Sequence, residues 1–101
     1  METSLEEKVQ LKIAPMKMYD ILFFNDDYTP MNFVVELLMK VFNHTSESAI
    51  NLMMNVHESE SAVVGTYFYE IADEKRNTSL DFAKKFGFPL KVEMVESSTT
   101  A

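Results

Sequence analysis

The sequence predicts an α+β domain in which a three-stranded antiparallel sheet packs against three helices, in the order β-α-α-β-α-β. Short apolar runs with the two-residue period of strands are separated by longer segments in which apolar residues recur every three or four positions. The chain has 101 residues, with only two Gly and three Pro. This length and composition leave room for one core and little room for long loops.

The first strand is predicted over residues 17–24, where apolar residues occupy alternate positions. A helix follows it. Thr29 is expected to cap the free N–H groups of this helix, and Pro30 to occupy its first position, where a missing N–H costs nothing. The next apolar residues recur every three or four positions and define one buried face: Met31, Val34, Leu37, Leu38, Val41 and Phe42.

A second helix is predicted after a break at residues 43–44. Thr45 or Ser46 is expected to cap it, and Glu47 is favourably placed in its first turn. A polar turn over residues 58–61 follows the helix. The residues of its expected buried face are Ala49, Ile50, Met53, Met54 and His57.

β-Branched and aromatic residues are concentrated at residues 62–71, which favours a strand, and Gly65 is expected to mark a bulge in it. A third helix is predicted over residues 72–86 and is ended by Gly87. The middle of this helix is polar, which is unusual for a segment that packs on a sheet. The last strand is predicted over residues 90–95.

Composition limits the classes of function. Sixteen acidic and nine basic residues give a net charge of −7, which disfavours binding to nucleic acid or to an anionic membrane and favours cationic partners. The chain has no Cys, which excludes thiol chemistry. No apolar run reaches the length of a membrane span. We expect a cytoplasmic protein, with an organelle stroma left open, folded over residues 18–95 between a flexible tail at 1–17 and a frayed end at 96–101.

A cluster of hydrogen-bond acceptors is predicted where the first strand turns into the first helix. Asn25, Asp26 and Asp27 follow the strand. Antiparallel packing of the first two helices through a short turn is expected to bring His57 beside them. Amide, carboxylate and neutral imidazole groups all accept hydrogen bonds, so the cluster suits a small ammonium group. The free α-amino group of a protein is such a ligand.

The same residues also have simpler interpretations. Asn and Asp are common before helices because they bond their own backbone, and a histidine often ends a helix. Three methionines and two valines nearby either line a deformable apolar pocket or belong to the core. They are Met31, Met53, Met54, Val34 and Val56. Their convergence beside the acceptors favours a pocket for a positively charged group followed by a large apolar side chain.

Catalysis is not indicated. Asp26, Asp27 and His57 are residue types that bind metals, but no spacing signature of a metal site supports them. Thr29 or a serine near His57 lacks a glycine-built oxyanion hole, and the chain has no phosphate-binding loop. We therefore expect no enzymatic activity and no cofactor. A metal-dependent hydrolase that uses these two aspartates and the histidine is the alternative from another class.

Motifs distributed over residues 18–95 carry a family resemblance. They are Asn25-Asp26-Asp27-Tyr28-Thr29-Pro30-Met31, Phe33-Val34, Met53-Met54-Asn55-Val56-His57, Gly65, Glu70, Ala72, Lys75 and Pro89-Leu90. With these residues the chain resembles the ClpS family. Members of that family are adaptors that select substrates for a Clp AAA+ unfoldase–protease.

The resemblance implies a non-enzymatic adaptor that binds proteins whose first residue is Leu, Phe, Tyr or Trp and docks on the N-terminal domain of the unfoldase. The groups that would hold the α-amino group are Asn25, Asp26 or Asp27, and His57. The residues that would surround the first side chain are Thr29, Met31, Val34, Met53, Val56 and Leu90. Among these, Met31 would disfavour β-branched side chains. The residues that would dock on the unfoldase are Tyr28, Glu70 and Lys75.

The chain departs from the family pattern at two places. Residues 58–61 are Glu-Ser-Glu-Ser where the family has Gly and often a basic residue, and Arg76 and Ser79 occupy positions that are commonly apolar. Both places lie beside the expected docking face. An alternative is therefore a divergent protein that docks on the unfoldase and inhibits or redirects it without binding N-degrons. We expect a monomer, because no exposed apolar stripe should remain once the helices pack.

Overall fold

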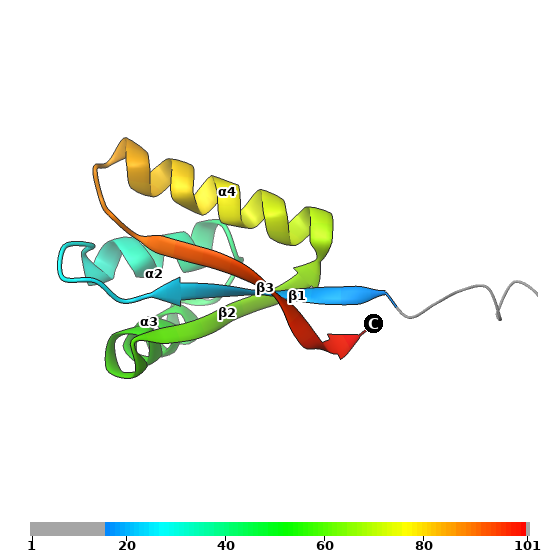
Figure 1. Ribbon diagram of the computed structural model, residues 1–101. Coiled ribbons are helices and arrows are strands. Elements are labelled where there is room, and N and C mark those ends of the chain that lie inside the picture. The colour runs from blue at the N-terminus through cyan, green and yellow to red at the C-terminus, as the bar shows by residue number, and fades with distance from the viewer. Residues whose placement is uncertain (1–15, 101) are drawn as a thin grey trace, which may run out of the picture.

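The computed structural model describes residues 16–100 and confirms the predicted fold class and order of elements (Figure 1). The elements are β1 (Lys17–Phe24), α2 (Met31–Lys40), α3 (Ser46–Ser59), β2 (Ser61–Phe68), α4 (Tyr69–Lys85) and β3 (Lys91–Thr100). Within the described range, none of the helices combines the length and the apolar character that crossing a bilayer requires.

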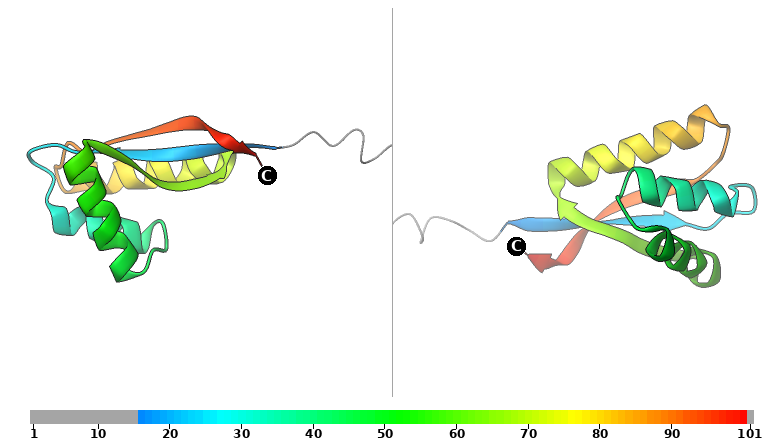
Figure 2. Two further views of the ribbon diagram at one scale, coloured as in Figure 1. Left: turned by 90° about the horizontal axis from the view of Figure 1, so that it is seen from below. Right: turned by 180° about the vertical axis from the view of Figure 1, so that it is seen from behind.

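The strands form an antiparallel sheet in the order β2-β1-β3, and all three helices lie on one of its faces (Figure 2). Strand β1 is therefore paired along both edges. Its side chains Ile21 and Phe23 are fully buried and form the centre of the core, as their alternation predicts. Each helix contributes buried residues to the same core, among them Leu38, Ala49 and Ala72.

Gly65 marks a β-bulge, as the sequence predicts. The register of the two strands is Ile21 with Gly65 and Leu22 with Val63. Val64 is thus the extra residue of β2. It is buried, and its carbonyl oxygen lies 2.7 Å from Nε2 of His44, a residue of the α2–α3 connection. A Cβ atom on Gly65 would collide with the ring of Tyr67, so the bulge passes close to that ring only because residue 65 has no side chain.

The start of α2 differs from the prediction. Pro30 is the N-cap residue, and its carbonyl oxygen accepts the N–H groups of Phe33 at 3.1 Å and Val34 at 3.3 Å. The side chain of Thr29 does not cap the helix, because its hydroxyl donates instead to Asp26 at 2.7 Å. The predicted cap is therefore wrong by one residue, and the competing partner is the carboxylate that precedes it.

The predicted buried face of α2 is confirmed at most positions. The buried residues are Val34, Leu37, Leu38 and, just after the helix, Phe42. Val41 is half-buried. The prediction that Met31 is buried is wrong, since its side chain is 43% exposed. It stands in the first turn of the helix, next to the exposed turn residues that lead into it.

The observed buried face of α3 is rotated about the helix axis relative to the predicted face. The residues that face the core are Ala49, Leu52, Met53 and Val56, which follow the three-and-four spacing. The residues predicted to be buried that are exposed are Ile50, Met54 and His57. Helix α3 packs mainly on α2 and β2, so a narrow stripe makes all of its contacts. The predicted cap is confirmed, because the Thr45 hydroxyl accepts the Ser48 N–H at 3.2 Å.

The boundary between β2 and α4 comes three residues earlier than the sequence predicts. The β-rich segment 62–71 favours a longer strand, but the chain is already helical from Tyr69. Phe68 pairs with Met18, and β1 extends only one residue further in that direction. A longer β2 would therefore lack a partner strand, and the helix supplies the hydrogen bonds that the strand could not make.

Strand β3 continues to Thr100, past its predicted end at residue 95, and its far end pairs with the start of β1. The expectation of a frayed end at 96–101 is therefore wrong as far as Thr100. Of the predicted tail, 1–17, Lys17 belongs to β1. The rest of the two predicted ends lies outside the described residues, apart from Met16, which precedes the strand.

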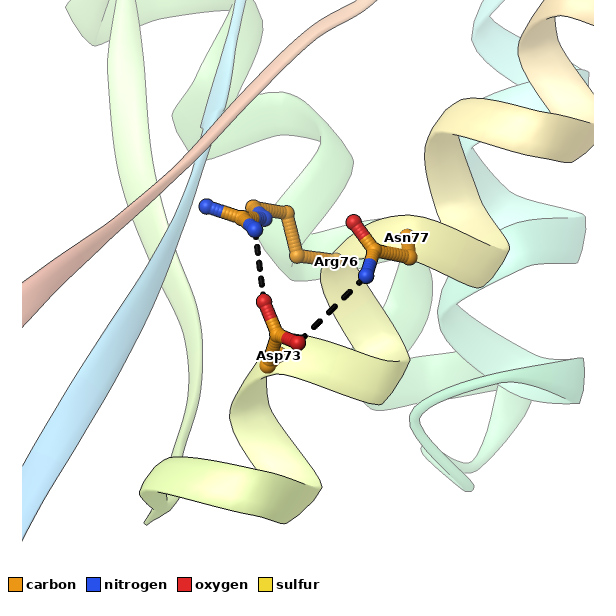
Figure 3. Close-up of polar contacts among 3 residues, drawn as sticks. All are labelled: Asp73, Arg76 and Asn77. Atoms are coloured by element: carbon orange, nitrogen blue, oxygen red, sulfur yellow. Dashed lines mark hydrogen bonds and ion pairs between the residues drawn. The ribbon is translucent and has the colours of Figure 1, made fainter.

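The polar middle of α4 is accommodated by bonds within the helix. Asp73 accepts Arg76 Nη2 at 2.6 Å and Asn77 Nδ2 at 3.5 Å (Figure 3). The fully buried hydroxyl of Ser79 donates to the carbonyl of Lys75 at 2.8 Å. Buried hydroxyls are tolerated when they are hydrogen-bonded, so Ser79 fits against the sheet in place of a larger apolar side chain.

Lys75 joins α4 to the end of α2. Its Nζ donates to the carbonyl of Val41 at 2.6 Å, and Val41 is the C-cap residue of α2. The same ammonium group lies 5.7 Å from the ring centroid of Phe42 and 5.2 Å from that of Tyr67. Lys75 thus satisfies a helix-terminal carbonyl and lies against two aromatic rings in a half-buried position.

We predict that Lys75→Met lowers the free energy of unfolding by about 1–2 kcal/mol, because methionine keeps the apolar stem but loses the bond to Val41 and the contact with the rings. Urea unfolding at neutral pH would measure this change. The matched control is Lys85→Met, an exposed lysine of the same helix, which should change the free energy by less than about 0.5 kcal/mol. Equal stabilities of the two variants would contradict the structural role of Lys75.

Candidate functional site

The turn between β1 and α2 is fastened to the end of α3. The N–H of Asn25 donates to the carbonyl of Glu60 at 2.8 Å, and the preceding Phe24 pairs with Ser61. Glu60 has a φ of 70°, a left-handed conformation that ends the helix. The last turn of α3, which carries His57, is thereby held beside the turn that carries the predicted acceptors.

The carboxylate of Asp26 shapes that turn. Its Oδ1 accepts the backbone N–H groups of Tyr28 at 2.8 Å and Thr29 at 2.7 Å, and its Oδ2 accepts the Thr29 hydroxyl at 2.7 Å. Both oxygens are therefore occupied by groups of Tyr28 and Thr29, in the manner of an Asx turn. This arrangement corresponds to the simpler interpretation of an Asn-Asp-Asp sequence, and for Asp26 that interpretation is correct.

Two opposing effects act on the pKa of Asp26. Partial burial raises the pKa by removing water from the carboxylate. The hydrogen bonds from the Thr29 hydroxyl, the Thr29 N–H and the Tyr28 N–H together lower it by more, so the pKa of Asp26 lies below its ordinary value. The folded turn therefore binds the ionised carboxylate more favourably than the protonated acid.

The other predicted acceptors have no such partners. Asp27 and His57 are exposed and Asn25 is half-buried. Within the described part of the chain, none of their side chains takes part in a hydrogen bond or an ion pair. His57 stands in the last turn of α3, where the helix dipole favours a positive or hydrogen-bonded group. An amide, a carboxylate and an imidazole thus remain available to a ligand at this turn.

The predicted side-chain pocket combines buried and accessible residues. Val34, Val56 and Leu90 are almost completely buried and belong to the core cluster. Met53 is half-buried and packs against the same cluster, whereas Met31 is largely accessible. Thr29 is half-buried, and its hydroxyl already donates to the carboxylate before it. Three of the predicted pocket residues thus belong to the core, and the two methionines, which are side chains that adapt to different shapes, keep part of their surface accessible.

The three residues expected to dock on the unfoldase do not form one patch. Tyr28 is 78% exposed and follows the end of β1, whereas Glu70 follows Phe68, which pairs with the start of β1. The eight residues of β1 separate the two sites by about 23 Å. Lys75 is half-buried and bonded to Val41. Tyr28 and Glu70 are thus exposed near opposite ends of β1, whereas Lys75 is bonded to the end of α2.

The sequence did not predict a second feature of this end of the molecule. Helices α2 and α4 and the connection from α4 to β3 form the walls of an open groove of about 380 Å³. We call it the aromatic groove; the apolar residues that line it are Pro30, Phe33, Leu37, Phe82, Phe86 and Phe88. It contains none of the predicted site residues. The expectation that no exposed apolar surface remains is wrong, because Phe86 is 58% exposed.

The metal hydrolase alternative finds no support in the arrangement of ligands. Among residues 16–100, no three side chains of the types His, Cys, Asp or Glu gather as they would around a metal ion. Asp26 is committed to the turn, which leaves one carboxylate and one imidazole. Two such groups fall short of the three protein ligands that catalytic zinc sites use.

Comparisons with known proteins identify the relatives of this chain. Residues 14–93 match the sequence model of the family described as ATP-dependent Clp protease adaptor protein ClpS. The chain is 44% identical over 95 residues to the ATP-dependent Clp protease adapter protein ClpS of Lawsonia intracellularis, covering 94% of this chain and 87% of the relative. It is 40% identical over 98 residues to the protein of that name from Clostridium acetobutylicum, covering 95% of this chain and 97% of the relative.

A solved structure is similar as well. Agrobacterium tumefaciens ClpS2 bound to L-phenylalaninamide superposes with a TM-score of 0.78 at 36% sequence identity, covering 80% of this chain and 98% of that one. The similarity extends over the three strands and three helices described above, so the fold is shared as well as the sequence.

We predict that Asp26→Ala lowers the free energy of unfolding by about 1–2 kcal/mol at pH 7, because it removes three hydrogen bonds that shape the turn. The pKa of Asp26 is lower in the folded state than in the unfolded chain, so its contribution is fully present above the unfolded pKa and is lost as the pH falls through the folded pKa. Denaturant unfolding between pH 7 and about pH 2 would measure both effects.

The matched control for this experiment is Asp27→Ala, which removes the exposed neighbouring carboxylate. It should change the stability at pH 7 by less than about 0.5 kcal/mol and keep the wild-type loss of stability in acid. A larger effect of Asp27→Ala than of Asp26→Ala would reverse the assignment of the two aspartates.

Proposed function

Because this chain belongs to the ClpS family of Clp protease adaptor proteins, we propose that it binds substrate proteins through a free N-terminal Leu, Phe, Tyr or Trp and delivers them to a Clp AAA+ unfoldase. One observation carries the proposal. At a turn held against the end of α3, Asn25, Asp27 and His57 keep unused hydrogen-bonding groups, while Asp26 is consumed in shaping the turn.

An α-amino group fits the acceptors that are left. It carries one positive charge and three N–H donors, and Asp27, the Asn25 carbonyl and a neutral His57 offer one acceptor each. A hydrogen bond that involves an ionised group contributes about 1.5–3 kcal/mol when it is sheltered from water. An N-terminus that is acetylated loses the charge and two of its donors, so the same site would reject it.

The first side chain would lie on the buried residues Val34, Val56 and Leu90, with Met53 and Met31 beside it. The Agrobacterium tumefaciens relative was solved with L-phenylalaninamide, a molecule that combines a free amino group with a benzyl side chain. This supports a ligand of the same chemistry here. Met31 would act as a gate: its side chain in the first turn of α2 would crowd a ligand that is branched at Cβ.

The proposed contact with the N-terminal domain of the unfoldase uses Tyr28 and Glu70, two exposed residues at opposite ends of β1. Lys75 would support it indirectly by holding α4 against the end of α2. We place the adaptor in the compartment of its protease, the cytoplasm or an organelle stroma, and expect it to act as a monomer.

We predict that the full-length protein binds a fluorescent peptide beginning with Phe and does not bind its N-acetylated twin. Asp27→Asn and His57→Ala should each weaken binding about tenfold or more, because each removes one bond to the ammonium group. Fluorescence anisotropy titration measures all of these affinities. Glu47→Gln is the control for net charge, since it removes one carboxylate at the opposite end of α3 and should leave the affinity unchanged.

Equal binding of the free and acetylated peptides, or wild-type affinity in both variants, would overturn the assignment of the amino-group site. If neither peptide binds, the better hypothesis is a divergent protein that docks on the unfoldase without binding N-degrons. It would then suppress degradation by the Clp protease of internally tagged substrates as well as of substrates with N-terminal Phe. An N-degron adaptor would promote degradation of the latter.

We predict that Met31→Ala increases the affinity for peptides beginning with Ile or Val relative to Leu, because the smaller side chain leaves room for a branch at Cβ. Met31 is largely exposed, so the substitution should fold normally. Anisotropy with four otherwise identical peptides beginning with Leu, Phe, Ile and Val measures the selectivity. The same ratio of affinities in the variant and the wild type would remove Met31 from the gating role.

A further inference from the structure

The aromatic groove is a preformed apolar surface outside the site described above. It lies between α2 and the end of α4, two helices that approach each other at the end of the molecule where β1 ends and β3 begins (Figure 1). Its volume of about 380 Å³ falls in the range of ligand sites, and such sites are mostly apolar. Apolar surface that is gathered in a groove is one of the features that mark interaction sites.

One wall of the groove is fixed in shape. The ring of Phe33 lies 4.8 Å from that of Phe88 and 5.8 Å from that of Phe86, in edge-to-face arrangements. The backbone holds this wall as well, because Gly87 has a φ of 76° and the Phe88 N–H donates to the carbonyl of Ala83 at 2.8 Å. Phe33 and Phe88 are thus anchored on the core, whereas the ring of Phe86 remains 58% exposed.

The groove is bordered by positive charge on a chain that is acidic overall. Lys84 and Lys85 occupy the last turn of α4, and neither makes an ion pair with another described residue. Lys40 lines the groove and pairs with Glu36 at 3.1 Å, but both side chains are largely exposed, so the pair is easily exchanged for another partner. An apolar segment with carboxylates beside it complements this surface.

The N-terminal segment of the same chain has that chemistry. Leu5 is followed directly by Glu6 and Glu7, and the first seven residues include three glutamates and no Lys or Arg. The groove is also within reach. It lies at the far end of β1, about 23 Å from the start of that strand, and the chain from Leu5 to Met16 spans up to about 36 Å when extended.

We propose that the N-terminal segment docks on its own domain, with Leu5 in the aromatic groove and Glu6 and Glu7 beside the lysines at the end of α4. Docking covers the exposed rings of Phe82 and Phe86 and holds the first residues of the chain against the folded domain. A protein that binds the segment, or that occupies the groove, would release it. The groove shares no lining residue with the amino-group site, so we expect this contact to be independent of N-degron binding.

The test uses the full-length chain. Because the chain has no Cys, Ser4→Cys introduces a single thiol that carries a nitroxide label next to Leu5. In dilute isotope-labelled protein, we expect the amide signals of Gly87 and Phe88 to lose most of their intensity when the label is oxidised. The loss should disappear in Leu5→Ser and in Phe86→Ala. It should persist in Ile50→Ala, the control, which changes another exposed apolar residue, on α3.

Full intensity at Gly87 and Phe88 with the oxidised label would overturn the proposal. So would loss of intensity in isotope-labelled protein without a nitroxide that is mixed with nitroxide-bearing protein of natural isotope content, because it would show that a second copy fills the groove. Persistence of the effect in both Leu5→Ser and Phe86→Ala would show that the segment passes nearby without docking. Phe86 is 58% exposed, so its replacement should leave the fold intact, and the remaining amide signals report this directly.

Discussion

Strand β1 is hydrogen-bonded along both edges and buries Ile21 and Phe23 completely on one face, so every other element either pairs with it or packs on it. The helices all lie on that face. The two ends of the strand are therefore the two ends of the molecule, and each connection that leaves them is placed by the register of the sheet. The candidate site stands at one of these ends, where β1 stops and the chain turns into α2.

The two neighbouring aspartates of this turn have different surroundings and hence different roles. Asp26 receives three hydrogen bonds within the turn, which lower its pKa and hold the backbone of residues 26–29. Asp27 points to no described partner. A rigid turn keeps an ionised carboxylate available beside the end of α3, and such preorganisation reduces the entropy that a ligand would otherwise lose on binding. The hydrogen bond from the Asn25 N–H to the Glu60 carbonyl also fixes the end of α3, and with it His57, relative to the turn.

Buried and half-buried polar groups lie against backbone carbonyls in this small core. Lys75 bonds the end of α2, the Ser79 hydroxyl bonds within α4, and His44 approaches the bulge carbonyl of Val64. Each of them satisfies a backbone carbonyl or lies beside one where two elements meet, so polar residues take positions that an apolar side chain could also fill. The polar character of α4 is thus compatible with a stable helix.

The sequence by itself determined the class of fold, the order of the elements, the bulge at Gly65 and the family, because periodicity, turn residues and a specific motif are local properties of the chain. It also indicated which residues gather at the turn after β1. The tertiary structure decided which face of α3 is buried, where β2 gives way to α4 and how far β3 runs, since each depends on a partner element that local periodicity does not contain. It also decided that Thr29 bonds Asp26 rather than capping α2, and that Phe86 stays exposed. Both outcomes follow from competition between hydrogen-bond partners or packing surfaces that meet only in the folded chain.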